Sequence, residues 1–156
     1  NLLYTDPEDG WKVTTEEGVA AVDEAIAYLQ AATPLKRVTW NQYLGFACKD
    51  MVLSQGPAGL VGPKDASGQT LEAIYKAKYG THTTSAGQSL NYGARPTTTQ
   101  TDGVTSTAGE KIVLQLLIDD SAAAIKTRLN RENIFAAGFR VMGAYTGFDT
   151  HTTQTS

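Results

Sequence analysis

The chain has little of what metal and disulfide chemistry need: one cysteine, Cys48, and two histidines, His82 and His151, among 156 residues. A single thiol excludes an internal disulfide framework and a cysteine-based zinc cluster. The apolar neighbours of Cys48 indicate a packed side chain rather than a nucleophile. Both histidines lie among threonines without an H-x-x-x-H spacing, so the pattern does not favour a metal site. We expect neither a metal nor another cofactor.

Positive charge and long apolar runs are also scarce. Lys and Arg number 13 against 16 Asp and Glu, which gives a formal net charge of -3 and no basic stripe for nucleic acid. The longest strongly apolar run, residues 112–118, is far shorter than the roughly 20 residues of a membrane-spanning helix. We therefore expect neither a nucleic-acid partner nor a membrane span.

Glycosylation signals are limited to composition. No Asn-x-Ser/Thr sequon occurs in the chain, so N-glycosylation is not indicated. Threonine and serine gather in segments 81–85, 97–107 and 150–156, which is compatible with O-glycans on Thr-rich loops.

The N-terminal sequence has no secretory signal pattern. It starts at Asn1 rather than Met, which is compatible with a processed N-terminus.

The spacing of apolar residues predicts helices and a few strands. The first helix is expected to start at a capping box formed by Thr14 and Glu17 and to bury Val19, Val22 and Ile26 on one face. Glycines and prolines predict a loop over 56–63. Few strands among several helices predict an α+β fold with helices packed on a small antiparallel sheet. We predict helices near 14–31, 39–54, 70–78 and 109–120, and strands near 88–92 and 139–146.

A chain of this length with 41% hydrophobic residues is long enough for one substantial core and too short to suggest two. We expect an extended N-terminal arm over residues 1–13 and a single domain over 14–156. The arm carries four large apolar residues without a helical period: Leu2, Leu3, Tyr4 and Trp11. Such residues in a terminus predict a surface that ties the arm down.

The remaining polar clusters do not define a catalytic site. Asp119 and Asp120 end an apolar helix, but adjacent helical residues do not face each other, so we interpret the pair as a solvated helix end. Arg128 and Arg131 indicate solvated or structural roles rather than anion binding. No G-x-S-x-G elbow or phosphate-binding loop is present. On chemistry alone the chain is not a recognisable enzyme.

Several segments nevertheless occur in the order of a known family. The stretch SAGQSLNYG at 85–93 carries Gly-Gln-Ser where that family has a Gly-Glu-Asn strand motif. The chain resembles the CAP superfamily of cysteine-rich secretory proteins, antigen 5 and pathogenesis-related proteins, in the cysteine-poor branch of bacteria and microbial eukaryotes. The resemblance covers roughly residues 14–150 and is carried by segments 34–41, 44–51, 56–62, 85–93, 110–120, 133–135 and 139–143.

The resemblance implies an α-β-α sandwich, an extracellular location, and a cavity whose two histidines and two glutamates hold a divalent metal. Those ligand positions are substituted here. Pro63 stands at the first His, Gln88 and Ser89 at the Glu and Asn of the strand motif, Lys111 at the helix Glu, and Asn130 near the second His. Such a set lacks the carboxylates or imidazoles that a divalent cation needs. The cavity is therefore predicted to be vestigial.

Four functions fit these features. The first is a non-enzymatic extracellular module, a filament or surface-layer subunit that assembles as a homo-oligomer through the arm and an open sheet edge. The second is an extracellular binder of a sterol, a lipid or another small ligand. The third is a divergent hydrolase that uses Glu110, His82 or His151. The fourth is a folded domain whose partner is determined by sequence elsewhere.

Overall fold

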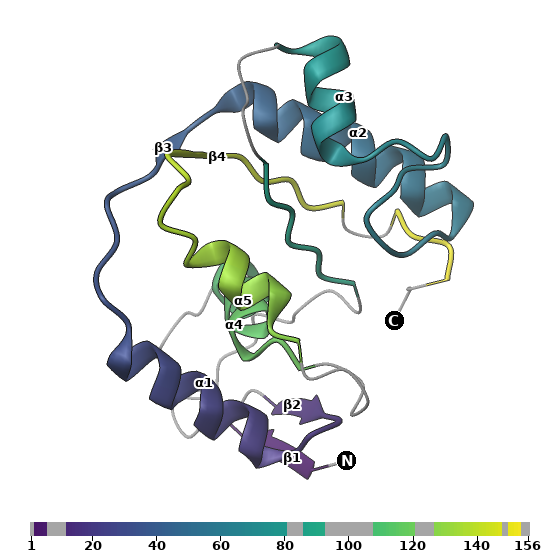
Figure 1. Cartoon of the computed structure of the whole chain (residues 1–156). Coiled ribbons are helices and arrows are strands. Elements are labelled where there is room, and N and C mark those ends of the chain that lie inside the picture. Colours follow the sequence, from purple (N-terminus) through teal and green to yellow (C-terminus); the bar gives the residue numbers. More distant parts are fainter. Residues whose placement is uncertain are drawn as a thin grey trace. The chain divides into compact units, whose positions relative to one another are not determined.

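A computed structural model of the chain describes residues 2–5, 12–80, 86–92, 108–120, 127–147 and 150–153. Its mixture of helices and strands confirms the α+β class (Figure 1). No helix in these ranges is long and apolar enough to cross a membrane. The elements are β1 (Leu2–Thr5), β2 (Lys12–Thr15), α1 (Val19–Ala31), β3 (Thr39–Trp40), α2 (Gln42–Ala58), α3 (Leu71–Lys78), α4 (Ala108–Ile118), α5 (Leu129–Ile134) and β4 (Val141–Met142).

The chain forms two compact units that interleave in sequence. Unit 1 comprises Asn1–Pro34 and Pro96–Phe135, and therefore holds β1, β2, α1, α4 and α5. Unit 2 comprises Leu35–Arg95 and Ala136–Ser156, and holds β3, α2, α3 and β4.

The N-terminus of unit 1 is an antiparallel strand pair. β1 pairs with β2 in a register that places Leu3 opposite Thr14, as the neighbouring strands in Figure 1 show. Because Thr14 belongs to a strand, the predicted capping box is wrong. The hydroxyl of Thr15 instead donates to the carbonyl of Gly18 at 2.7 Å, and α1 begins at Val19, after Gly18 with φ 74°.

The core of unit 1 lies between α1 and α4. Ala21, Val22 and Ala25 of α1 pack against Ile118, with Leu114 beside them. The predicted buried face of α1 is therefore only partly correct: Val22 is buried, but Val19 and Ile26 are 42% and 46% exposed. α1 contributes two alanines and Val22 to this cluster. Of the three residues predicted to be buried, the cluster therefore contains Val22 alone.

Unit 2 starts with a short parallel pair of strands. The amides of Thr39 and Asn41 donate to the carbonyls of Arg140 and Met142 at 2.9 and 2.7 Å, which pairs β3 with β4. α2 consequently begins at Gln42 rather than near Thr39. Its N-terminus is capped by the Asn41 side chain, which accepts from the amides of Tyr43 and Leu44, as an N-cap asparagine does.

Two sequence predictions for strands are corrected here. Residues 88–92 contain no strand, and the strand predicted over 139–146 is reduced to Val141–Met142. The described strands form two separate pairs, one antiparallel and one parallel, so the antiparallel sheet expected between the helices is not shown. Short stretches of alternating residues lack the length that specifies a sheet strand without its neighbours.

α2 continues through Pro57, which contradicts the loop predicted from residue 56 onward. Because proline has no amide hydrogen, the helix lacks the hydrogen bond from residue 57 to the carbonyl of Leu53. Gly59 adopts a left-handed conformation with φ 64°. The amide of Leu60 donates to Gln55 O and that of Gly59 to Gly56 O, at 3.1 and 3.0 Å. This is the Schellman pattern of helix termination.

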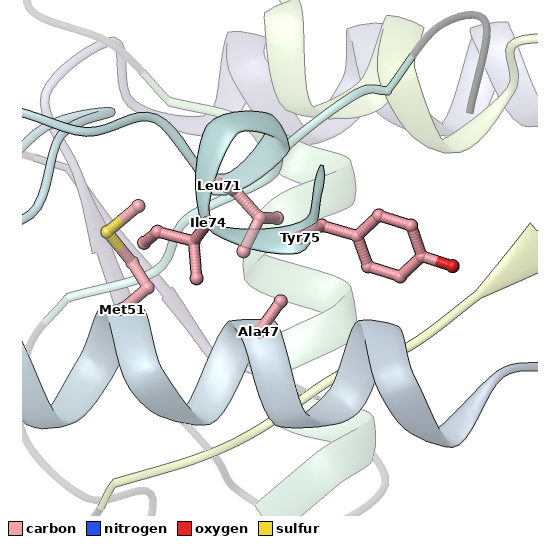
Figure 2. Packing of buried hydrophobic residues seen from close by; sticks show 5 residues of the cluster. All are labelled: Ala47, Met51, Leu71, Ile74 and Tyr75. Carbon is pink, nitrogen blue, oxygen red and sulfur yellow. The ribbon is translucent and has the colours of Figure 1, made fainter. Parts of the chain in front are cut away.

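The core of unit 2 joins α2 to α3. Figure 2 shows Ala47 and Met51 of α2 pointing toward Leu71 and Ile74 of α3, with Tyr75 beside them. The helix predicted over 70–78 is confirmed, since α3 spans Leu71–Lys78. Its N-cap is Thr70, whose hydroxyl accepts from the amide of Ala73 at 3.2 Å. Local capping and apolar spacing agree here, so the sequence prediction succeeds.

Candidate functional site

The residues of the predicted vestigial cavity fall into both units. Pro63, Gln88 and Ser89 belong to unit 2, and Lys111 and Asn130 belong to unit 1. Pro63 is exposed, Gln88 and Ser89 are half-buried, and Lys111 in α4 is only 4% exposed. In unit 2 the Nε2 of Gln88 is buried without a hydrogen-bond partner, so it is a donor that lacks an acceptor.

A buried polar network joins the turn beside Pro63 to the segment that carries Gln88 and Ser89. Gln55, 2% exposed, donates from Nε2 to the carbonyls of Gly62 and Lys64, each at 2.7 Å. Tyr92 accepts from the amide of Gly62 at 3.1 Å and donates to Oε1 of Gln55 at 3.1 Å. These groups are amides and a phenol, which position chain segments but supply no charge.

Asn130 is held by the carboxylate of Asp119. Its backbone amide and its Nδ2 donate to the two carboxylate oxygens of Asp119 at 2.8 and 2.7 Å, and the amide of Arg131 donates to the same carboxylate at 3.2 Å. Asp119 thus caps the start of α5. It is 8% exposed and has φ 51°, so the interpretation of a solvated helix end is wrong.

Asp120 also has a structural role. Its carboxylate accepts from the backbone amides of Glu16 and Glu17, at 2.5 and 3.1 Å, and so holds the segment that leads into α1. The two adjacent carboxylates therefore serve different segments. This agrees with the expectation that they do not share one ligand.

A cluster of opposite charges in unit 1 consists of Glu17, Glu24, Arg128 and Arg131, and we call it the ion-pair cluster. Arg128 contacts both glutamates, with 2.6 Å between its Nη2 and Glu24 Oε2, and Arg131 lies 2.8 Å from Glu24 Oε1. The hydrogen bond from Arg128 is the largest cause that lowers the pKa of Glu24 to about 2, against desolvation. The hydrogen bonds that Arg128 donates to Glu24 and, second, to Glu17 raise the pKa of Arg128.

Both arginines are buried, at 8% and 1% exposed, and they also bind backbone. Arg131 donates to the carbonyls of Leu117 and Ile118 at 2.6 and 2.8 Å, and Arg128 to that of Asp119 at 2.9 Å. These carbonyls belong to the end of α4, where four such groups lack helical partners. The sequence left a solvated and a structural role open for the two arginines, and these contacts show the structural role. The spacing of charges in the sequence did not indicate it.

The N-terminal arm is extended where the structure describes it. Leu2, Leu3 and Tyr4 lie in β1 and pair with β2 of the same chain, while Trp11 lies outside the described residues. In the described part of the chain no third strand pairs with β1 or β2. Each strand of this pair therefore has one open edge.

Glu110 lies in α4 of unit 1, and His151 lies in unit 2. His82 lies outside the described residues. The Nε2 of His151 lies 2.8 Å from the carbonyl of Leu60, and its ring packs edge-on against Tyr92. Among the residues that the structure describes, no three His, Cys, Asp or Glu side chains are grouped so that they could hold a metal ion.

Comparison with known proteins gives no assignment for this arrangement. No family model, curated protein or solved structure matches the chain.

Proposed function

We propose that this chain is a non-enzymatic extracellular module of the CAP type, an α-β-α sandwich with a small antiparallel sheet, that assembles into a filament or surface layer as a homo-oligomer. The ordered resemblance of segments 34–62, 85–93 and 110–143 supports the fold. The tie between Gly62 and Tyr92 also supports it, because the resemblance places these two segments beside one cavity.

The observation that carries the assembly role is the exposed parallel strand pair of unit 2. Val38, Trp40, Val141 and Met142 are 37%, 58%, 43% and 46% exposed. Parallel strands in folded proteins are normally covered on both faces, and a lone two-stranded pair is marginally stable in water. Apolar strands left uncovered by their own unit are expected to be covered by another surface.

The edges of the β3–β4 pair favour a strand of another chain as the surface that covers it. The amides of Thr39 and Asn41 face β4, so the backbone groups of Trp40 point to the opposite edge. In the described part of the chain no strand pairs with that edge. An open edge flanked by apolar side chains is a template for a strand of a neighbouring chain.

The vestigial cavity supports a non-enzymatic role. Pro63, Gln88, Lys111 and Asn130 stand where the resemblance places metal ligands. An amide, an ammonium group and a proline ring do not offset the dehydration of a divalent ion. Zinc or calcium binding with micromolar affinity, measured by titration calorimetry, would contradict this part of the proposal.

The strand-edge role is tested with a charge on the exposed pair. Trp40→Lys places an ammonium group on the open edge, where lysine opposes strand addition. We expect the particle mass of this variant, measured by sedimentation, to fall toward that of the monomer, while its circular dichroism spectrum stays that of the wild type. Val61→Lys is the control, because Val61 is equally exposed, at 60%, and lies outside the strands. An unchanged mass for Trp40→Lys would exclude this edge as an assembly contact.

The arm is tested separately by deleting residues 1–9. Assembly lost with the fold intact supports an assembly role for Leu2, Leu3 and Tyr4. If particle mass does not change, the arm serves only to pair with β2.

A further inference from the structure

An exposed aromatic cluster lies where α2 meets the end of α3. Tyr43 and Phe46 of α2 are 46% and 47% exposed. Their ring centroids are 6.1 Å apart, and each also contacts Tyr79, at 6.4 and 6.0 Å. Only Tyr79 packs against the core of unit 2. The other two rings therefore expose much of their surface although they are held in place by aromatic contacts.

One edge of this cluster is polar and fixed. The same carboxylate oxygen of Asp50 accepts from the Tyr79 hydroxyl at 2.8 Å and from Lys78 Nζ at 2.9 Å. The hydrogen bond from Lys78 is the first cause that lowers the pKa of Asp50, so this carboxylate is ionised at neutral pH. Asp50 thus offers a positioned acceptor beside the rings, and Lys78 offers a donor.

We propose that Tyr43, Phe46 and Tyr79, with Asp50 and Lys78 at their edge, form a binding platform for a pyranose unit of a neutral polysaccharide. A pyranose ring has an apolar face of C–H groups and a rim of hydroxyls. The apolar face packs on one ring and meets the edge of the other, because the planes of Tyr43 and Phe46 lie 76° apart. The rim hydroxyls donate to Asp50 and accept from Lys78. Ligand sites of this kind combine an aromatic wall with a few placed polar groups.

The charge of the platform favours a neutral ligand. The carboxylate of Asp50 is paired with the ammonium group of Lys78, so the polar edge carries no net charge. A strongly anionic ligand would be repelled by Asp50 and a strongly cationic one by Lys78. Neutral hydroxyls bind to both groups without separating them.

The area of the platform argues against a second protein chain. Aromatic side chains carry about 150–250 Å² each, so two half-exposed rings and a partly covered third present roughly 200–300 Å². A stable protein interface needs about 800 Å² from each partner. The apolar surface of α2 is also interrupted, since Asp50 lies between Phe46 and the exposed Leu53.

The experiment is titration calorimetry of the whole chain with laminarihexaose, cellohexaose and mannohexaose, and with hexagalacturonate as an anionic control. At least one neutral hexasaccharide is expected to bind. Tyr43→Ala and Phe46→Ala are each expected to weaken it by about fivefold or more, because each removes one aromatic contact. Tyr145→Ala is the matched control: this tyrosine is also exposed, at 38%, and lies in unit 2 outside the platform.

Two further variants separate the platform from effects on folding. Tyr43→Phe retains the ring and is expected to bind as the wild type does. Asp50→Asn removes the charge but not the shape, and is expected to weaken binding. The proposal fails if no neutral hexasaccharide binds, if hexagalacturonate binds more tightly, or if Phe46→Ala binds normally. A reduced particle mass for Phe46→Ala with unchanged sugar binding would identify a protein interface instead and would also overturn it.

Discussion

Arg131 is the most deeply buried charged side chain of the described residues, at 1% exposed. Its guanidinium binds two carbonyls at the end of α4 and the carboxylate of Glu24 in α1. A buried guanidinium is tolerated because its donors are occupied. In the described part of the chain, the two carbonyls in turn accept from this side chain.

Replacing Arg131 with methionine should therefore be costly. Arg131→Met fills much of the volume but removes the hydrogen bonds to the Leu117 and Ile118 carbonyls and to Glu24. We expect a loss of about 3 kcal/mol in the free energy of unfolding, measured by urea denaturation. Arg140→Met is the control, because Arg140 is exposed and donates only to nearby carbonyls, those of Ala137 and Phe139. Equal losses for the two variants would contradict the structural role of the cluster.

Acid should weaken unit 1 through Glu24. Its pKa is lowered from 4.5 to about 2 in the folded chain. The folded state therefore binds this proton less readily than the unfolded state does. The stabilisation is fully present above pH 4.5 and is lost as the pH falls toward about 2. In urea denaturation series at pH 6 and pH 3, the free energy of unfolding of Glu24→Gln should change less with pH than that of the wild type. An identical pH dependence would exclude Glu24 as a contributor.

At the scale of helices and strands, helix ends depend on contacts from distant segments. The end of α2 is an example, because Gly59 both ends the helix and meets the C-terminal segment. A Cβ at Gly59 would lie 2.9 Å from side-chain atoms of Thr152 and Thr153. The amide of Thr152 also donates to Gly56 O at 3.0 Å. This part of the C-terminal segment is therefore packed against α2 rather than free.

Gly59→Ala is expected to destabilise the chain more than Gly68→Ala does. Both glycines have positive φ, 64° and 83°, so an alanine at either position costs about 1–2 kcal/mol in backbone strain. Only Gly59 lacks room for a Cβ, whereas nothing lies within 4 Å of that position at Gly68. Urea denaturation gives both losses, and hydrogen exchange at the amide of Thr152 should accelerate only in Gly59→Ala. Equal losses and equal exchange would contradict the packing of the C-terminal segment.

The sequence predicted those elements that local signals specify. α3 was predicted from its apolar spacing, a signal contained within about ten residues, and the structure adds the cap at Thr70. The start of α1 was not, because Thr14 pairs with Leu3, a contact that apolar spacing does not reveal. α5 was missed since its N-terminus is capped by Asp119, which precedes the helix by ten residues. Contacts at such separations compete with local propensity and override it.

The residues of the candidate site could be named from the sequence, but their contacts could not. The resemblance selected Pro63, Gln88, Ser89, Lys111 and Asn130 by alignment of motifs. It could not show that Asn130 is bound by Asp119 or that the Gln88 amide lacks an acceptor. Both depend on side-chain partners that the alignment does not contain. The aromatic platform was missed for the same reason, because it combines residues of α2 with Tyr79 at the end of α3.

At the scale of the whole molecule, the two units differ in what holds each together. Unit 1 combines a small alanine-rich core with the ion-pair cluster. Unit 2 relies on the apolar contact between α2 and α3. Both leave large apolar side chains exposed, among them Ile26 in unit 1 and Trp40 in unit 2. Surfaces of this kind are the basis of the assembly role that we propose.

Sedimentation velocity of the whole chain over a wide range of concentrations tests that role most directly. We expect particles heavier than the monomer whose mass rises with concentration, because exposed apolar strands bury surface when chains associate. A filament would in addition sediment as an elongated particle without a fixed upper mass, as open head-to-tail contacts produce. A compact monomer at every concentration would contradict the assembly function.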